Sequence, residues 1–475
     1  MIMAELKPYA AYKDSAVPWL GQVPEHWQLR RPKWLFRKME RPVRDEDQVV
    51  TCFRDGVVTL RKNRRVSGFT ESLKEIGYQG IRRGDLVIHA MDVFAGAVGV
   101  SDSDGKGTPV YSVCQPESNA NAQFYAYLVH EMARSQWILA LATGIRERST
   151  DFRYSSFASQ SVPLPSLPEQ VAIVRYLDHA DRKVRRAIRA RRQLIKLLTE
   201  QKQAIIQRAV TRGLDPNVRL KSSGVAWLGD VPEHWEILRL KDACQRIVGG
   251  STPRSDKAEY WNGDVVWVTP IDVTRSQRLD TSLRRITRDG LNSCSATLVP
   301  AGSIIVTCRA PVGKVAVAAT ELCTNQGCKA VVLRSEVLTT AFGALLMQTL
   351  ESELQSLANG TTFSEIPLHK LACVPIPVPT VGEQDAIVRD VDDATANADK
   401  ATDAARREID LLREYRTRLI ADVVTGKLDV RDVPVPDDET DAMPEELEAA
   451  ADGEATDPTD DAAEGNSESS AEETA

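Results

Sequence analysis

The sequence predicts an α+β fold in which two mixed α/β domains are separated by a pair of long antiparallel helices that form a coiled coil. Two repeated phrases support this prediction. WLGxVPEHW occurs at residues 19–27 and again at 227–235, and EQxAIV occurs at 169–174 and again at 383–388. Each EQxAIV phrase opens a long stretch with helical periodicity, and short β-branched runs fill the stretches between the phrases.

The repeat extends over nearly the whole chain. The first phrase recurs after 208 residues and the second after 214, so the second variable stretch is longer than the first. We interpret the chain as two halves of one plan, related by a pseudo-twofold internal repeat. The expected segments are a first domain (1–160), a proline-rich bridge with the central helix (161–215), a second domain (216–372), a second bridge with the distal helix (373–430) and a C-terminal tail (431–475).

The tail differs in charge from the rest of the chain. From Asp437 onward there are 16 Asp and Glu and no Lys or Arg, while the preceding residues hold 60 basic against 51 acidic side chains. We expect the acidic tail to be disordered, because it has almost nothing apolar to bury. The body before it is mildly basic, which permits a polyanionic partner.

Cysteine, histidine and hydropathy patterns argue against several classes of protein. The eight cysteines are scattered without a CxxC pair, and the six histidines form no HExxH set, so we predict no metal site and no catalytic residue. No apolar run approaches the roughly 18 residues that a membrane span needs. The N-terminus has no apolar signal core. We therefore expect a cytoplasmic protein that does not associate with a membrane.

The helices are predicted over 169–212 and 383–427. Prolines at 163, 165 and 168, and at 375, 377 and 379, exclude a helix in the bridge before each one. The first helix has 12 basic and 4 acidic residues and the second has 8 and 11, which suits mutual pairing. The apolar seam expected to pair the helices and to dock partners comprises Val174, Leu177, Val184, Ile188, Ile195, Leu198 and Ile205 on the first and Val388, Val391, Ile409, Leu412 and Leu419 on the second.

The variable stretches contain short strand candidates and two helix candidates. The strands are expected at 85–90, 97–101, 264–270, 303–308 and 314–319, and the helices at 121–142 and 339–358. Polar loops precede several of these strands. Arg309 lies in CRAPVGK, and Asn325 with Gln326 lies in CTNQG. Arginine can read guanine, and asparagine or glutamine can read adenine, through paired hydrogen bonds, so these loops are candidates for base recognition.

Together these residues resemble the DNA-specificity subunit of type I restriction-modification systems. The resemblance covers the chain to about residue 430. It depends on the doubled WLGxVPEHW phrase, on GGSTPRSDKAEYWNGDVVWVTP, RAPVGKVAVA and TNQG in the second half, and on PxPxxxEQxAIV before each helix. The first variable stretch matches loosely, through GDLVIHAMDVFAGAVGVS (84–101), and the acidic tail has no counterpart in the pattern.

The resemblance implies two target-recognition domains, each reading one half of a bipartite asymmetric DNA site. It implies no chemistry on this chain. Two modification subunits with S-adenosylmethionine would methylate adenine, and a restriction subunit using ATP and Mg²⁺ would cleave unmethylated double-stranded DNA. The candidate DNA-contacting residues are Thr252, Arg254, Trp261, Arg309, Lys314, Asn325 and Gln326 in the second domain and Arg64, Arg65, His89 and Met91 in the first.

Two alternatives remain open from the residues alone. A coiled-coil adaptor that does not bind DNA would explain the helices but not the polar loops. A recognition module of another restriction class would keep DNA binding and change the partner. A catalytic interpretation is weak, because FAGAVG (94–99) lacks the motif that would hold an adenine amine and VGK (312–314) lacks the spacing of a P-loop.

Overall fold

The computed structural model describes residues 6–64, 76–141, 151–358 and 365–436. These residues form two compact units. Unit 1 combines Met1–Arg191 with Arg407–Ala475, and unit 2 is Arg192–Arg406. The units cut across the five consecutive segments expected from the sequence, because both long helices belong partly to each unit. The acidic tail from Asp437 and the candidate Arg65 lie outside the described residues.

Unit 1 is built on a mixed set of sheets and helices. Its strands are β1 (Tyr12–Asp14), β2 (Gln22–Pro24), β3 (Gln28–Arg30), β4 (Phe36–Lys38), β5 (Val50–Cys52), β6 (Val58–Leu60), β7 (Gln79–Ile81), β8 (Leu86–His89), β9 (Val98–Val100), β10 (Gly105–Gly107), β11 (Tyr111–Pro116) and β12 (Val162–Leu164). Its helices are α1 (Ala122–Arg134), α2 (Trp137–Leu141) and α3 (Tyr154–Ser159), together with parts of α4 (Leu167–Arg212) and α10 (Val381–Val424).

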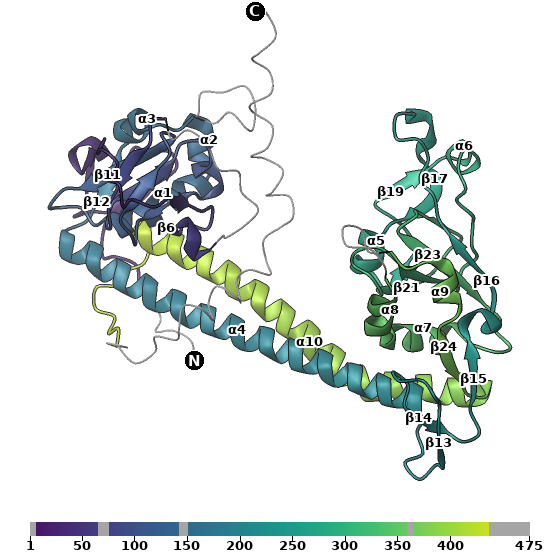
Figure 1. Ribbon diagram of the computed structural model, residues 1–475. Helices are drawn as coiled ribbons and strands as arrows, with labels where there is room; N and C mark the ends of the chain where they lie inside the picture. Colours follow the sequence, from purple (N-terminus) through teal and green to yellow (C-terminus); the bar gives the residue numbers. More distant parts are fainter. Residues whose placement is uncertain (1–5, 65–75, 142–150, 359–364, 437–475) are drawn as a thin grey trace, which may run out of the picture. The chain divides into compact units, whose positions relative to one another are not determined.

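The central sheet of unit 1 has the antiparallel order β4-β11-β8-β9. Residues 86–88 are buried, which explains why they read as a continuous apolar run. Helix α1 packs on this sheet (Figure 1). Its residues Phe124, Leu128 and Met132 are completely buried. The side chain of Asn121 caps α1 by accepting hydrogen bonds from the backbone N–H groups of residues 123 and 124.

Unit 2 repeats this plan with a larger sheet. Its strands are β13 (Leu220–Ser222), β14 (Asp230–Pro232), β15 (Glu236–Arg239), β16 (Cys244–Gly249), β17 (Trp261–Val268), β18 (Arg278–Leu279), β19 (Arg284–Ile286), β20 (Ile304–Thr307), β21 (Val315–Ala318), β22 (Cys323–Thr324), β23 (Cys328–Leu333) and β24 (Pro375–Val378). Its helices are α5 (Pro270–Arg275), α6 (Arg288–Asn292), α7 (Thr340–Thr349), α8 (Glu351–Leu357) and α9 (Leu368–Ala372), together with the other parts of α4 and α10.

The main sheet of unit 2 has the order β16-β23-β20-β21-β18, and a smaller sheet has the order β19-β17-β22. The first four strands of the main sheet correspond in order and direction to β4-β11-β8-β9 of unit 1. The smaller sheet and α6 carry their own apolar cluster around Trp261 and Trp267. The α+β class and the long helices predicted from the sequence are confirmed.

The two long helices pair antiparallel within each unit. In unit 1 the Asp181 carboxylate forms an ion pair with Arg416, and Arg191 Nε lies 2.7 Å from Glu408 Oε2. In unit 2 Lys202 Nζ lies 2.7 Å from Asp399 Oδ1. As the residue number rises along α4, the number of its partner on α10 falls, so the two helices run antiparallel. The excess of basic side chains on α4 also faces the excess of acidic side chains on α10.

The seam residues differ in how deeply they are buried. Those on the buried side are Leu177, Val184, Val391, Ile409 and Leu419, and those half-buried are Val174, Ile188, Ile195, Leu198, Ile205, Val388 and Leu412. Ile206 is 1% exposed, so it is more buried than its neighbour Ile205. The burial is deepest toward the helix ends, where each helix also covers the core of a unit.

Two helix predictions were too long. The stretch expected to be helical over 121–142 breaks at Gln136, whose φ of 59° is left-handed, and divides into α1 and α2. The stretch expected over 339–358 divides at Leu350 into α7 and α8. Neither break falls at a glycine or proline, so the local sequence carried no signal for it.

The proline-rich bridges are strands. β12 pairs with β3 and β24 pairs with β15, each as a two-stranded antiparallel ribbon. A ribbon of two strands leaves one side of each strand unpaired, so prolines that lack an N–H are tolerated there. Pro168 lies in the first turn of α4, where the missing N–H would have no helical partner in any case.

Candidate nucleic-acid interface

The two repeated phrases bind each other in unit 1. Glu169 of the EQxAIV phrase is 4% exposed, and its carboxylate accepts hydrogen bonds from Trp27 Nε1 at 3.0 Å and from Tyr9 Oη at 2.9 Å. His26 Nε2 lies 3.0 Å from the same carboxylate. Burial, and then the charge of Glu169, raise the pKa of Tyr9. His26 and Trp27 of the PEHW segment thus bind the first turn of α4.

The same interaction occurs in unit 2. His234 Nε2 lies 2.6 Å from Glu383 Oε1, and Trp235 Nε1 donates to that oxygen at 3.4 Å. Burial by itself would raise the pKa of Glu383, but hydrogen bonds from His234 and Thr380 outweigh burial and lower it. Both copies of PEHW therefore hold the first turn of a long helix.

The glutamine of each repeated phrase ties the long helix to a second helix. Gln170 is completely buried, and its Oε1 accepts a hydrogen bond at 2.8 Å from the backbone N–H of Asn121, the residue that caps α1. Gln384 is equally buried and accepts a 2.8 Å hydrogen bond from the backbone N–H of Thr339, which caps α7. These contacts fix each variable region onto the paired helices.

In unit 1 the segment near the N-terminus is hydrogen-bonded to the segment that follows α10. The backbone N–H of Asp429 donates to Lys7 O at 2.8 Å, and Tyr12 Oη donates to Lys427 O at 3.0 Å. Arg431 Nη2 pairs with Asp429 at 2.6 Å, which raises the arginine's pKa, and its guanidinium lies 5.0 Å from the Tyr9 ring centroid. In unit 2 the corresponding connection between α4 and β13 is continuous chain.

Glycines at these closures allow a close approach to the repeated tryptophans. Gly426 has a φ of 80°, and a Cβ there would lie 2.9 Å from the Trp27 ring. Gly213 has a φ of 73°, and a Cβ there would lie 3.3 Å from the Trp235 ring. The left-handed backbone and the approach to an aromatic ring both favour glycine at these two positions.

Three loops meet at one edge of unit 2. Ser251 donates its backbone N–H to Thr324 O at 3.0 Å, and Thr252 Oγ1 donates to Gln326 Oε1 at 2.5 Å. A Cβ at Gly250 would lie 2.0 Å from Thr324 O, so only glycine permits this approach. We refer to residues 249–256, 308–313 and 325–327 as the recognition loops of unit 2. Five of the predicted site residues, Thr252, Arg254, Arg309, Asn325 and Gln326, lie on them.

Asn325 has a structural role that the sequence did not indicate. Its Oδ1 accepts a 2.9 Å hydrogen bond from the backbone N–H of Gly327 and so forms a local turn. Gly327 O in turn accepts from the backbone N–H of Cys308 at 2.8 Å, which joins the second and third recognition loops. The Asn325 amide nitrogen is not used in this turn.

Arg309 is held by a residue that sequence reasoning missed. Glu365 Oε2 accepts hydrogen bonds from Arg309 Nε at 2.9 Å and from Nη2 at 2.7 Å. Glu365 Oε1 lies 3.5 Å from Lys329 Nζ, whose side chain is 8% exposed. Burial raises the pKa of Glu365, but its interactions with Arg309 and Lys329 outweigh burial and lower it. The carboxylate of Glu365 is therefore ionised at neutral pH.

Arg254, on the first recognition loop, and the two remaining candidates, Trp261 and Lys314, have partners within unit 2. Trp261 is 8% exposed and packs against Trp267 at 5.3 Å between ring centroids, while the Arg284 guanidinium lies 3.7 Å from the Trp261 ring centroid. Arg254 is exposed and pairs with Asp256 at 2.7 Å. Lys314 Nζ pairs with Glu351 at 2.7 Å. Trp261 thus supports the first recognition loop from the core and offers little surface to a ligand.

In unit 1 the candidates gather around the loop after β8. Arg64 Nη1 pairs with Asp55 at 2.8 Å and lies over the Phe53 ring. His89 Nε2 lies 3.6 Å from Asp92, while Met91 is 46% exposed. The turn between β5 and β6 links the two groups, because Asp55 pairs with Arg64 and the neighbouring Arg54 Nη2 lies 3.2 Å from Asp92 Oδ1.

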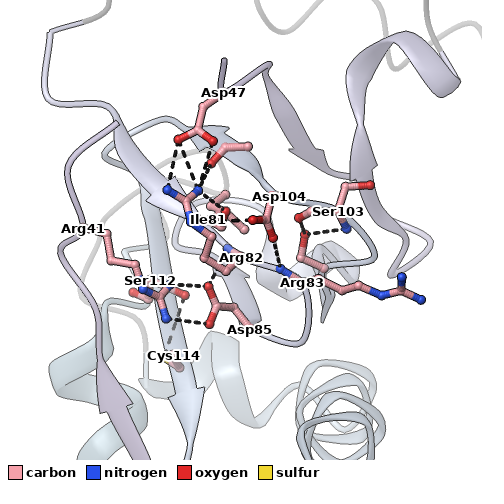
Figure 2. A network of polar contacts seen from close by, with 12 residues as sticks. Arg41, Asp47, Ile81, Arg82, Arg83, Asp85, Ser103, Asp104, Ser112 and Cys114 are labelled. Carbon is pink, nitrogen blue, oxygen red and sulfur yellow. Dashed lines mark hydrogen bonds and ion pairs between the residues drawn. The ribbon is translucent and has the colours of Figure 1, made fainter. Parts of the chain in front are cut away.

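A buried ionic network stabilises another turn of unit 1 (Figure 2). Arg82 Nη1 lies 3.1 Å from both carboxylate oxygens of Asp47, which is 2% exposed in its side chain. Arg41 pairs with Asp85, whose carboxylate also accepts the backbone N–H of Arg82 at 2.7 Å. These pairs fix the turn between β7 and β8 and leave the side chain of Arg83 exposed beside it (Figure 2).

The described residues contain neither a cluster of metal-binding side chains nor a helix that could span a membrane. No group of three or more His, Cys, Asp or Glu side chains is arranged there to hold a metal ion. Among the same residues, no helix combines the length and apolarity needed to cross a membrane.

Comparison with known proteins relates the chain to one group. Residues 232–408 match the family model described as type I restriction modification DNA specificity domain. The type I restriction enzyme MjaIX specificity subunit of Methanocaldococcus jannaschii is 35% identical over 163 residues, which are 34% of this chain and 38% of that protein. That match therefore spans well under two thirds of the relative.

Longer but weaker similarities cover most of the chain. The putative type I restriction enzyme MjaX specificity subunit of the same organism is 21% identical over 449 residues, covering 87% of this chain and 96% of that protein. A solved chain from a type I R-M system superposes with a TM-score of 0.62 at 20% identity, covering 86% of this chain and 99% of that one. The structural similarity to this solved chain supports the α+β fold described above.

Proposed function

We propose that the chain is a DNA-specificity subunit of a type I restriction-modification system and that it selects a bipartite, asymmetric DNA site for partner enzymes. In this proposal the chain recognises DNA and the partner enzymes carry out the chemistry. In this proposal unit 1 reads one half-site and unit 2 reads the other. S-adenosylmethionine would be bound by the modification subunit, and ATP with Mg²⁺ by the restriction subunit.

One observation carries the proposal of two recognition units. The residues that attach each variable region to the helices are the same in both halves: Trp27, Glu169 and Gln170 in unit 1 correspond to Trp235, Glu383 and Gln384 in unit 2. The loops that these scaffolds carry differ between the halves. A protein that recognises two different half-sites needs two different polar surfaces, and a duplicated scaffold can hold both.

The same duplication supports two copies of one partner. The ion pairs in each unit join the two long helices in antiparallel order, which is the arrangement that a pseudo-twofold internal repeat would have. Because such a repeat presents one surface twice, we propose that two modification subunits bind the chain, with a restriction subunit completing the complex. The acidic tail is proposed to be disordered and to lie outside this repeat.

Methylation mapping tests the proposed function. Replacing the variable region of unit 2, residues 244–374, by that of a relative with a different site is expected to change one half of the methylated sequence and preserve the other. The host genome would be mapped for adenine methylation with the original gene, with the hybrid and without either. Methylation that persists without the gene, or a hybrid that alters both half-sites, would refute the assignment of one unit per half-site.

A single substitution tests the recognition loops. Arg309→Ala is expected to weaken specific binding by about 1–3 kcal/mol, as loss of a paired base contact does. Binding of the full complex to the mapped site would be measured in competition with non-specific DNA. Equal loss for both DNAs would identify Arg309 as a phosphate contact, and unchanged binding would remove it from the interface.

A further inference from the structure

Arg309 presents only one edge of its guanidinium for further contacts. The guanidinium has five N–H donors in a planar fork. Glu365 Oε2 accepts from Nε at 2.9 Å and from Nη2 at 2.7 Å, so it occupies the edge formed by these two nitrogens. Within the described residues, no other hydrogen bond or ion pair involves this side chain. The edge formed by Nη1 and Nη2 is therefore uncommitted.

The side chain of Glu365 is itself held from behind. Its other oxygen lies 3.5 Å from Nζ of Lys329, which projects from the central strand β23 and is 8% exposed. The next residue, Ile366, donates its backbone N–H to Cys308 O at 3.0 Å, which joins the segment of Glu365 to the loop of Arg309. The arginine and the glutamate thus sit on two segments that are hydrogen-bonded to each other.

Unit 1 has the same backbone joint without the arginine. Phe152 donates its N–H to Ala90 O at 3.0 Å, as Ile366 does to Cys308 in unit 2. This correspondence places Met91 at the position of Arg309 and Asp151 at the position of Glu365. Asp151 pairs with Arg153 at 2.7 Å, two residues along its own segment. The held arginine therefore distinguishes the second unit from the first.

We propose that Glu365 is a positioning residue that fixes Arg309 to read one guanine in the half-site recognised by unit 2, with Lys329 holding Glu365 in place. The open Nη1–Nη2 edge supplies the two parallel donors that guanine O6 and N7 accept in the major groove. Holding the other edge reduces the rotamer freedom that the arginine loses on binding. This inference rests on the proposed function.

The carboxylate also selects against contacts with the DNA backbone. A negative charge 2.7 Å from Nη2 repels phosphate oxygens that would otherwise compete for the guanidinium. An exposed arginine without such a partner binds any phosphate and contributes equally at every sequence. Pairing with Glu365 thus makes the contact of Arg309 with DNA depend on the base, where an unpaired arginine would bind any phosphate.

The test measures base preference with the full-length chain and its modification subunit. Each variant would methylate a pool of duplexes of random sequence, and the methylated molecules would be sequenced. We expect Glu365→Gln and Arg309→Lys each to lower the preference for one guanine on the order of tenfold. The half-site read by unit 1 should be unchanged, and it serves as an internal control for folding and assembly.

A base analogue gives a second measurement that needs no Glu365 variant. Replacing that guanine by 7-deazaguanine removes N7 alone. We expect this replacement to weaken binding by the original protein on the order of tenfold and to have no further effect on Arg309→Ala. This readout tests the contact between Arg309 and the guanine even if the glutamate variants fail to fold.

A matched variant controls for the loss of an ion pair. Asp242→Asn breaks the pair with Arg239 Nε, which lies at 2.9 Å in unit 2 outside the recognition loops, and should leave every base preference intact. The inference is overturned if Glu365→Gln lowers methylation at all sequences without changing base preference, or if 7-deazaguanine has no effect at any guanine of that half-site. A methylated sequence that is not bipartite would instead refute the proposed function.

Discussion

A chain that ends at Asp215 is expected to form a homodimer which, with the modification subunit, methylates a palindrome made of two copies of the half-site of unit 1. Such a fragment keeps one WLGxVPEHW phrase, one variable region and α4. It loses α10, whose buried residues Leu419, Val423 and Val424 complete the core of unit 1. The exposed core would drive association.

A second copy of the fragment can fill that gap. In the repeat, Ile205, Ala209 and Val210 of α4 correspond to the three lost residues of α10. Because each copy would offer this segment to the other, the contact closes as a twofold dimer and does not propagate. Lys202 would take the place of Arg416 and keep an ion pair with Asp181, whereas Arg191 would lose its partner Glu408.

Sedimentation and methylation mapping would check this prediction. Val210 is completely buried, so Val210→Asp in the fragment should leave a monomer. More salt should strengthen the dimer by screening repulsion between two basic helices. A fragment that stays monomeric at micromolar concentration would contradict pairing through the helices. Methylation at the asymmetric site of the full-length protein would contradict one unit per half-site.

Trp27→Ala is expected to destabilise unit 1 by about 3–5 kcal/mol, the usual range for removing a large aromatic side chain from a core. Trp27 is completely buried, and its Nε1 donates to the buried carboxylate of Glu169 at 3.0 Å. The substitution therefore creates a cavity and removes a donor from a buried charge. Trp27→Phe should cost less, because it removes the donor and keeps most of the volume.

Hydrogen exchange resolved by peptide would measure this effect in each unit separately, which a single melting curve of a two-unit chain cannot do. Protection should fall across unit 1 and persist in the sheet of unit 2. Trp34→Ala is the matched control, because Trp34 is 67% exposed and its removal should change the free energy of unfolding by less than about 0.5 kcal/mol. Equal loss of protection in both units would show that they unfold together.

Much of the architecture could be predicted, because local sequence patterns indicate most of its helices and strands. The apolar period of α4 and α10 and the β-branched runs of β8, β9, β20 and β21 identify these elements without knowledge of their partners. The breaks at Gln136 and Leu350 were missed, because neither falls at a glycine or a proline.

The site was harder to predict, because its contacts join distant parts of the chain. Repetition marked PEHW and EQxAIV as important, yet nothing in either phrase showed that Trp27 would bind Glu169 across 142 positions. Arg309 could be chosen for its chemistry alone. Glu365, which determines what the guanidinium of Arg309 can contact, lies 56 positions away in a stretch without a motif.

The closure of unit 1 by both ends of the chain has a consequence for synthesis. Unit 2 is one continuous stretch, so it can fold as soon as Arg406 has left the ribosome, whereas unit 1 also needs Leu419, Val424 and Val430. At roughly 5–20 residues per second, the intervening stretch from Arg192 to Arg406 delays that completion by about 10–40 s. We therefore expect the half that is translated first to fold last, with its apolar surface available to chaperones throughout the interval.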